Sequence, residues 1–258
     1  MPCRISTRPA LPSRARVTSL SERTGSTITR LQGWVAALRY GARRGRNKVA
    51  AGMILMTTAV TAQAETLTIA ALGDSLTQGY GLPAEQGFVP QLQNWLVERG
   101  HDVVIINAGV SGDTTAGGLN RVEWTLADGV DGMILALGGN DLLRGIPPEA
   151  SRSNLDNILK AATAQDIDVM LVGLPAPGNY GPDYKAAFDS MYPELAATYD
   201  ALHFKDFLAG LSVLPNRATT LRKYMQSDGI HPNAEGVALI VDAMGPTVEQ
   251  LLDRAAGS

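Results

Sequence analysis

Two segments of the chain carry side chains that could act together in a reaction. Ser75 directly follows the apolar run 67–72, so its hydroxyl would lie at a strand-to-helix turn, near backbone N–H groups that stabilise negative charge. Asp228 and His231 are three residues apart, so both can lie in one tight loop. An aspartate beside a histidine accepts its Nδ1–H and leaves Nε2 free to take a proton from a serine. This pattern predicts nucleophilic acyl transfer.

Two further segments could stabilise an oxyanion. Gly112 follows the apolar run 103–107, and a glycine lets the backbone approach a ligand closely and offers an unhindered N–H. Asn140 follows the run 132–137, and its side-chain NH₂ can donate to a negatively charged oxygen. Both segments lie where an expected strand ends, which is the edge at which open parallel sheets bind ligands.

Each of these residues alone also has an ordinary structural explanation. Ser75 can cap the following helix, and Asp228 or Asn233 can cap the last one. Gly112 and Asn140 can be common turn residues. Only the combination, with each segment at the carboxyl end of an expected strand or in the loop before the last helix, favours a catalytic site.

The chain has three histidines, and their positions differ. His101 precedes an expected strand, which is the wrong end of the sheet for chemistry. His203 lies in or beside a weak strand pattern and is expected to be structural. His231 is therefore the expected general base, and a His-based zinc site, which would need several of these side chains together, is not expected.

The elements that must position these residues alternate between strands and helices. Near-continuous apolar runs are typical of strands buried on both faces of a parallel sheet. They cover 67–72, 103–107, 132–137 and 169–173, with a weaker fifth at 202–204. Helical patterns cover 88–98, 114–127, 149–165, 184–199 and 234–253, with Asp113 and Ser151 expected as caps or first-turn residues. This alternation predicts an α/β fold with three α/β/α layers around a five-stranded parallel sheet.

The four segments together resemble the GDSL or SGNH hydrolase superfamily. The matching motifs are GDSLT around Ser75, VSGDT around Gly112, LGGND around Asn140 and DGIHPN around His231. Within it the chain is similar to the bacterial periplasmic thioesterase, arylesterase and lysophospholipase group, over nearly the whole length from Leu67. The resemblance implies a flavodoxin-like hydrolase fold, cleavage of carboxylic esters and possibly thioesters, and no cofactor or metal.

The resemblance also implies roles for individual residues. Ser75, His231 and Asp228 would form a catalytic triad, and the N–H groups of Ser75 and Gly112 would form an oxyanion hole with the Asn140 amide. A substrate wall is expected from two loops; its members would be Leu142, Leu143, Ile146, Pro175, Asn179 and Tyr180.

Other function classes fit the sequence less well. A carbohydrate deacetylase on the same fold would favour an aromatic-lined cleft, and the chain has few aromatic residues. A non-catalytic binding protein would not need both Ser75 and His231. A dinucleotide- or ATP-binding domain would need G-x-G-x-x-G or G-K-[ST] motifs, which the first turn lacks.

The first 64 residues have the pattern of a leader for export. Five basic residues lie between Arg39 and Lys48, the apolar run 49–60 follows, and Ala62-Gln63-Ala64 forms a small-x-small cleavage site. The 12 apolar residues are fewer than the roughly 20 that cross a bilayer, although a buried or interfacial helix would also fit them. We expect cleavage near Ala64, a hydrolase domain over 65–258, and a periplasmic or secreted location.

Charge and cysteine content narrow the partners. Residues 1–64 contain eleven Lys or Arg and one acidic residue, whereas residues 65–258 contain 11 and 24, a net charge of about −13. An acidic body argues against nucleic acid as a partner. The only cysteine is Cys3, which excludes disulfides and thiolate metal sites from the mature chain. We expect a monomer, with no membrane-spanning segment in its mature part, that acts on a small acyl ester or thioester.

Overall fold

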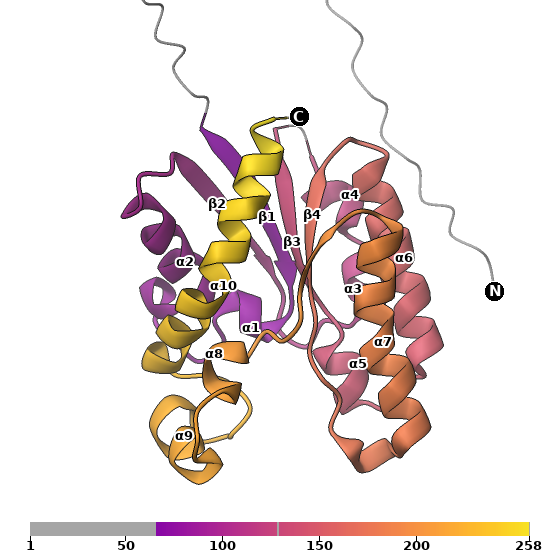
Figure 1. The fold of residues 1–258 in the computed structure, drawn as a ribbon, viewed down its shortest axis with the longest axis vertical. Helices are drawn as coiled ribbons and strands as arrows, with labels where there is room; N and C mark the ends of the chain where they lie inside the picture. Colours follow the sequence, from indigo (N-terminus) through magenta and orange to yellow (C-terminus); the bar gives the residue numbers. More distant parts are fainter. Residues whose placement is uncertain (1–65, 128, 258) are drawn as a thin grey trace, which may run out of the picture. The chain divides into compact units, whose positions relative to one another are not determined.

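The computed structural model describes residues 66–127 and 129–257. The expected leader, residues 1–64, lies outside the described residues. The described part forms an α/β/α arrangement around a parallel sheet, as the sequence predicts (Figure 1).

The five-stranded sheet has the order β2-β1-β3-β4-β5, and every pairing is parallel. Its strands are β1 (Leu67–Gly73), β2 (Val103–Gly109), β3 (Gly132–Ala136), β4 (Asp168–Val172) and β5 (Leu202–Phe204). The weak fifth strand is thus present, with three residues paired to β4. The chain runs outward from β1 to β2 and then returns to the other side of β1, so the switch point of the sheet lies between β1 and β3. Open α/β sheets bind ligands at this point, beyond the carboxyl ends of the strands.

Two helical layers cover the sheet (Figure 1). One layer contains α2 (Phe88–Val97) and α10 (Ala234–Ala255). The other contains α3 (Thr115–Leu119), α4 (Val122–Thr125), α6 (Pro148–Thr163) and α7 (Pro182–Thr198). Side chains alternate between the two faces of a strand, so Ile69 and Ala71 join the core under α2 and α10, whereas Leu72 joins the core under α6 and α7. The short elements are α1 (Ser75–Gln78), α5 (Gly139–Leu143), α8 (Ala209–Ser212), α9 (Arg217–Tyr224) and two 3₁₀ turns, Ala84–Gln86 and Gly178–Tyr180.

Helices α2 and α10 approach closely because one position in their contact is a glycine. A Cβ added to Gly245 would lie 2.5 Å from the Trp95 ring. Trp95 also donates its indole N–H to Asp242 at 2.9 Å, so both its apolar body and its polar atom are satisfied against α10. This packing holds α10 against α2, and α10 in turn holds the end of the loop that precedes it.

The helix expected over residues 114–127 is instead two short helices, α3 and α4. The break falls at Arg121, whose φ and ψ are −125° and 4° and whose side chain bonds to the sheet. Asp113 is not the cap that was expected. Thr114 caps α3 by accepting the N–H of Gly117, and Asp113 forms an ion pair with Arg121.

The expectation that β2 is buried on both faces is also wrong. Val103 and Ile105 are buried, but Val104 and Ile106 are 46% and 43% exposed. The physical reason is the strand order, which places β2 at an edge of the sheet. Val103 and Ile105 face α2 and α10, whereas Val104 and Ile106 face the side of α3, α4, α6 and α7, where the layer does not cover them. Among the helices that the structure describes, none has both the length and the hydrophobicity to cross a membrane.

Candidate active site

Ser75 lies at the carboxyl end of β1, in a turn with very little free space. Asp74 caps α1 by accepting the N–H of Leu76 at 3.0 Å, and Ser75 is the first residue of that helix. A Cβ added to Gly73 would lie 2.0 Å from Thr77 Oγ1, so the strand-to-helix turn can be this tight only with glycine there. The turn presents the Ser75 hydroxyl at the switch point of the sheet.

Asp228 and His231 lie together in the loop between α9 and α10. Asp228 Oδ2 is 2.6 Å from His231 Nδ1, and its other oxygen accepts the backbone N–H groups of Ile230 and His231 at 2.9 and 3.0 Å. The Gln226 N–H donates to the His231 carbonyl at 2.8 Å, which closes the loop behind the imidazole. These hydrogen bonds lower the pKa of Asp228 from 3.8 to about 2, with that from the His231 side chain contributing most. Asp228 is therefore ionised at neutral pH and can accept the Nδ1–H of His231.

The two segments meet at the Ser75 hydroxyl. His231 Nε2 is 2.9 Å from Ser75 Oγ, although the two residues are 156 positions apart. Asp228, His231 and Ser75 thus form one continuous line of hydrogen bonds. A base within 2.6–3.2 Å of a hydroxyl has the geometry for taking its proton.

Gly112 lies in a tight turn after β2. The Asp113 N–H donates to the Val110 carbonyl at 3.0 Å, and Gly112 has a φ of 82°, as the third residue of such a turn requires. Arg144 donates to the Gly112 carbonyl at 2.6 Å and holds the turn from the β3 side. A side chain at position 112 would strain this backbone.

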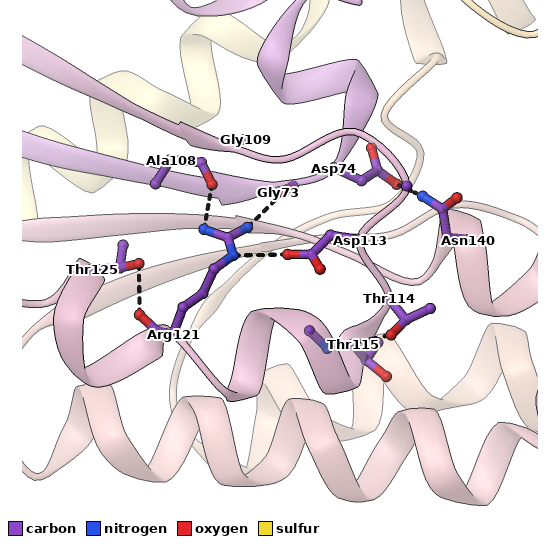
Figure 2. A network of polar contacts seen from close by, with 12 residues as sticks. Gly73, Asp74, Ala108, Gly109, Asp113, Thr114, Thr115, Arg121, Thr125 and Asn140 are labelled. Carbon is purple, nitrogen blue, oxygen red and sulfur yellow. Dashed lines mark hydrogen bonds and ion pairs between the residues drawn. The ribbon is translucent and has the colours of Figure 1, made fainter. Parts of the chain in front are cut away.

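Asn140 lies in the first turn of α5, after β3. Its side-chain NH₂ donates to Asp74 Oδ2 at 3.2 Å (Figure 2). One of its two N–H bonds is used in this contact, and the other can serve an oxyanion. Asp74 therefore contacts both the Ser75 turn, through Leu76, and Asn140.

Asp141, next to Asn140, is fully buried and anchors α5. Its carboxylate accepts the Thr115 N–H at 2.8 Å, the Thr115 hydroxyl at 2.6 Å and the Ser151 hydroxyl at 2.9 Å. These bonds tie α5 to α3 and to the first turn of α6. Asp74 and Asp141 thus both hold the turns that carry Ser75 and Asn140.

The chain was compared with known proteins. A model of the GDSL-like lipase/acylhydrolase family matches residues 71–239, which contain the four segments above. The chain belongs to this family. The esterase TesA of Pseudomonas aeruginosa is 37% identical over 194 residues, covering 75% of this chain and 93% of TesA. The Escherichia coli protein named thioesterase 1/protease 1/lysophospholipase L1 is 34% identical over 203 residues, covering 78% and 91%.

Solved structures agree. The crystal structure of the esterase EstA from Pseudoalteromonas, inhibited by monoethylphosphonate, matches with a TM-score of 0.65 and 32% identity, over 72% of this chain and 98% of EstA. The family and these relatives show that the chain is a serine ester hydrolase, and they confirm the resemblance seen in the sequence.

Asp74 has an unusual electrostatic environment in this GDSL-like hydrolase. Its side chain is buried, and burial raises its pKa from 3.8 to about 6, although hydrogen bonds from Leu76 and Asn140 act in the opposite direction. Burial disfavours the charged form of a carboxyl group because it removes the water that would solvate the charge. At neutral pH the protein therefore holds an ionised group next to the candidate nucleophile at a cost in stability.

Replacing Asp74 with asparagine is expected to stabilise the protein at neutral pH and to lower its activity. The folded-state pKa lies above the unfolded value, so the stabilisation from Asp74 is complete below about pH 3.8 and is lost as the pH rises through about 6. Asp74→Asn should thus raise the free energy of unfolding at pH 7.5 by up to about 3 kcal/mol, and by much less at pH 4. Turnover should fall because Asn140 loses its anionic partner. Urea unfolding at both pH values and kcat at pH 7.5 measure this; equal unfolding free energies at pH 7.5 would contradict it.

The expected substrate wall comes together only in part. Tyr180 lies over the α5 end: its hydroxyl is 3.5 Å from the Leu143 carbonyl, and a Cβ added to Gly145 would lie 3.1 Å from its ring. Tyr184 donates to the Ile146 carbonyl at 2.8 Å. Leu143 and Tyr180 are 61% and 43% exposed, so both offer apolar surface to a ligand.

Three other expected wall residues lie differently. Leu142 is 6% exposed and packs in the core under α6 and α7, so it supports this wall instead of lining it. Asn179 is exposed in the 3₁₀ turn before α7. Pro175 lines a separate cavity of 240 Å³ whose other members include Tyr192 and His203.

The remaining histidines lie away from Ser75, as expected. His101 contacts Glu249 of α10 at 3.1 Å, before β2 begins. His203 lies in β5, and burial lowers its pKa from 6.5. In the part of the chain that the structure describes, neither forms a hydrogen bond or ion pair with Asp228, Ser75 or Asn140.

Sequence reasoning missed one aromatic contact in the site. The Tyr80 ring lies 4.7 Å from the His231 imidazole at 43°, and the Tyr80 carbonyl accepts the Gln226 side-chain amide at 2.8 Å. Gln226 also donates to the Pro232 carbonyl at 3.0 Å, so it links the Ser75 side of the site to the His231 loop. Tyr80 comes five residues after Ser75, but its spacing alone gave no sign of this contact.

Proposed function

We propose that this enzyme cleaves carboxylic esters, and also thioesters, through an acyl-enzyme on Ser75. The observation that carries the proposal is the line of hydrogen bonds from Asp228 through His231 to Ser75, with distances of 2.6 and 2.9 Å. His231 takes the proton as Ser75 Oγ attacks the carbonyl, and returns it to the leaving alcohol or thiol. Water then attacks the acyl-enzyme by the same route.

Three groups would stabilise the tetrahedral intermediate. The N–H groups of Ser75 and Gly112 and the free N–H bond of Asn140 come from the segments that follow β1, β2 and β3. Fixed donors of this kind need no reorganisation as charge develops on the oxygen. The support for this role is geometric: the Gly112 turn and the Asn140–Asp74 contact both fix their donors before substrate binds.

Acyl chains are the substrate class that the exposed surface favours. Leu143 and Tyr180 are both exposed beside the α5 end, and Ile146 lies in the same segment. A carbohydrate acetyl ester is the alternative substrate. The leader pattern of residues 39–64 supports a periplasmic or secreted location, where the enzyme would meet lipid-derived or exogenous esters. Its proposed oligomeric state is a monomer.

The test uses the exported form, residues 65–258, and its Ser75→Ala variant. Both are assayed against p-nitrophenyl esters of increasing acyl length, a thioester and an acetylated sugar. We expect cleavage of the acyl esters by the wild type and loss of at least about 1,000-fold in Ser75→Ala. Ser153→Ala, an exposed serine of α6, is the matched control and should keep wild-type turnover.

Each outcome has a clear meaning. Retained activity in Ser75→Ala would remove Ser75 as the nucleophile and with it the proposed mechanism. Deacetylation of the sugar without cleavage of acyl esters would leave the mechanism in place and change the substrate class.

A further inference from the structure

A charged cluster on the outer side of the site joins the ends of two strands. Arg121, at the break between α3 and α4, donates through Nη1 to the Ala108 carbonyl at 2.7 Å and through Nη2 to the Gly73 carbonyl at 2.9 Å (Figure 2). Its third contact is Nε to Asp113 at 2.8 Å. One guanidinium therefore binds the carboxyl end of β1, the carboxyl end of β2 and the loop after β2.

The geometry uses the planar shape of the guanidinium. Gly73 pairs with Gly109 in the sheet, so the Gly73 and Ala108 carbonyls come from neighbouring strands at the same edge. Strand-end carbonyls that point away from water need a donor, and the fork of an arginine supplies two at a fixed spacing. An ammonium group, a compact point charge on a flexible stem, has no such fork.

The cluster is built into the fold and is not a surface ion pair. The side chains of Arg121 and Asp113 are 20% and 16% exposed. Asp113 fits only because position 117 is a glycine: a Cβ there would lie 1.8 Å from an Asp113 oxygen. The Arg121 carbonyl is itself held by the Thr125 N–H and hydroxyl, both at 2.9 Å.

The three anchor points flank the two backbone donors of the proposed oxyanion hole. Gly73 is two residues before Ser75, and Asp113 directly follows Gly112. The Gly73 carbonyl also accepts the Val110 N–H at 3.0 Å, so the turn that carries Gly112 starts from the same atom that Arg121 holds. A shift of this guanidinium would change the separation of the two N–H groups.

We infer that Arg121, with Asp113, is a positioning residue that sets the spacing of the Ser75 and Gly112 backbone donors. This inference rests on the proposed oxyanion hole. A misplacement of about 1 Å in such a site can cost on the order of 100-fold in rate, even when it originates away from the reacting atoms.

The experiment compares Arg121→Met, Arg121→Lys and Asp113→Asn in residues 65–258. We expect kcat on an acyl ester to fall by about 100-fold in Arg121→Met and about 10-fold in Arg121→Lys, with KM changed less than about 3-fold. Millimolar guanidinium should restore part of the kcat of Arg121→Met. Inactivation by a p-nitrophenyl phosphonate, whose oxygen occupies the hole, should slow by a similar factor. The midpoint of the pH profile should stay in place because His231 and Asp228 are untouched.

The controls separate positioning from folding. Arg152→Met removes an arginine whose exposed ion pair joins α6 to Glu194 of α7, and it should keep wild-type kcat. A fall in the melting temperature of Arg121→Lys with wild-type kcat in the folded protein would overturn the inference, because Arg121 would then be structural only. If Arg121→Met does not fold, Arg121→Lys and Asp113→Asn decide by the same kcat criterion. Failure of the proposed function is distinct, since it appears as retained activity in Ser75→Ala.

Discussion

Replacing His231 with alanine is expected to lower kcat on an acyl ester by about a million-fold, the loss seen when a serine hydrolase loses its base or its nucleophile. His231 Nε2, 2.9 Å from Ser75 Oγ, is the only base in contact with this hydroxyl among the described residues. Without it the serine stays protonated, and the leaving group receives no proton. Steady-state kinetics of the variant measure the loss.

The double variant sharpens this prediction. Ser75 and His231 act as one unit, so Ser75→Ala combined with His231→Ala should be no slower than either single variant. His101→Ala is the matched control, because the His101 side chain contacts Glu249 just before β2, away from Ser75, and its loss should leave kcat unchanged. Losses that multiply in the double variant would show that the two residues act independently, against the proposed triad.

Asn140→Ala is expected to lower kcat by about 100- to 1,000-fold with little change in KM, the effect of losing one donor from an oxyanion hole. The alanine removes both the donor and the 3.2 Å contact to Asp74. The fold should persist, because α5 is anchored by the buried Asp141 carboxylate and not by Asn140. Kinetics over a range of ester concentrations separate kcat from KM.

Asn157→Ala provides the comparison for this variant. Asn157 is exposed on α6 and donates its amide to the Ser153 carbonyl, so its loss should leave kcat at the wild-type level. If Asn140→Ala instead raises KM at an unchanged kcat, Asn140 binds the ground state of the substrate and does not belong to the hole.

The layers of the fold follow from the sequence because its signals are local. The runs at 67–72 and 132–137 are almost continuously apolar, and the structure buries β1 and β3 between two helical layers. Three of the segments that carry chemistry each follow an apolar run, so their meeting at one edge of the sheet could be predicted from parallel pairing. The fourth, with Asp228 and His231, precedes the last helix, and parallel pairing does not place it.

What could not be predicted depends on distant partners. The break at Arg121 has no periodicity of its own; it arises from bonds to Gly73 and Ala108, which are 48 and 13 positions away. The exposure of Val104 and Ile106 depends on the strand order, which no single segment encodes. Leu142 reads as an apolar loop residue, and only the packing under α6 shows that it faces the core.

The position of the triad along the chain has a consequence for when activity first arises. Ser75 is available early, but Asp228 and His231 lie 153 and 156 positions later, after every strand of the sheet. Bringing together groups so far apart in the sequence requires the intervening chain to be closed into one loop, at a cost in entropy. A chain in which the loop with Asp228 and His231 has not yet docked would hold a serine without its base. Hydrolysis therefore requires the complete fold, and we expect no activity before the loop between α9 and α10 has docked beside Ser75.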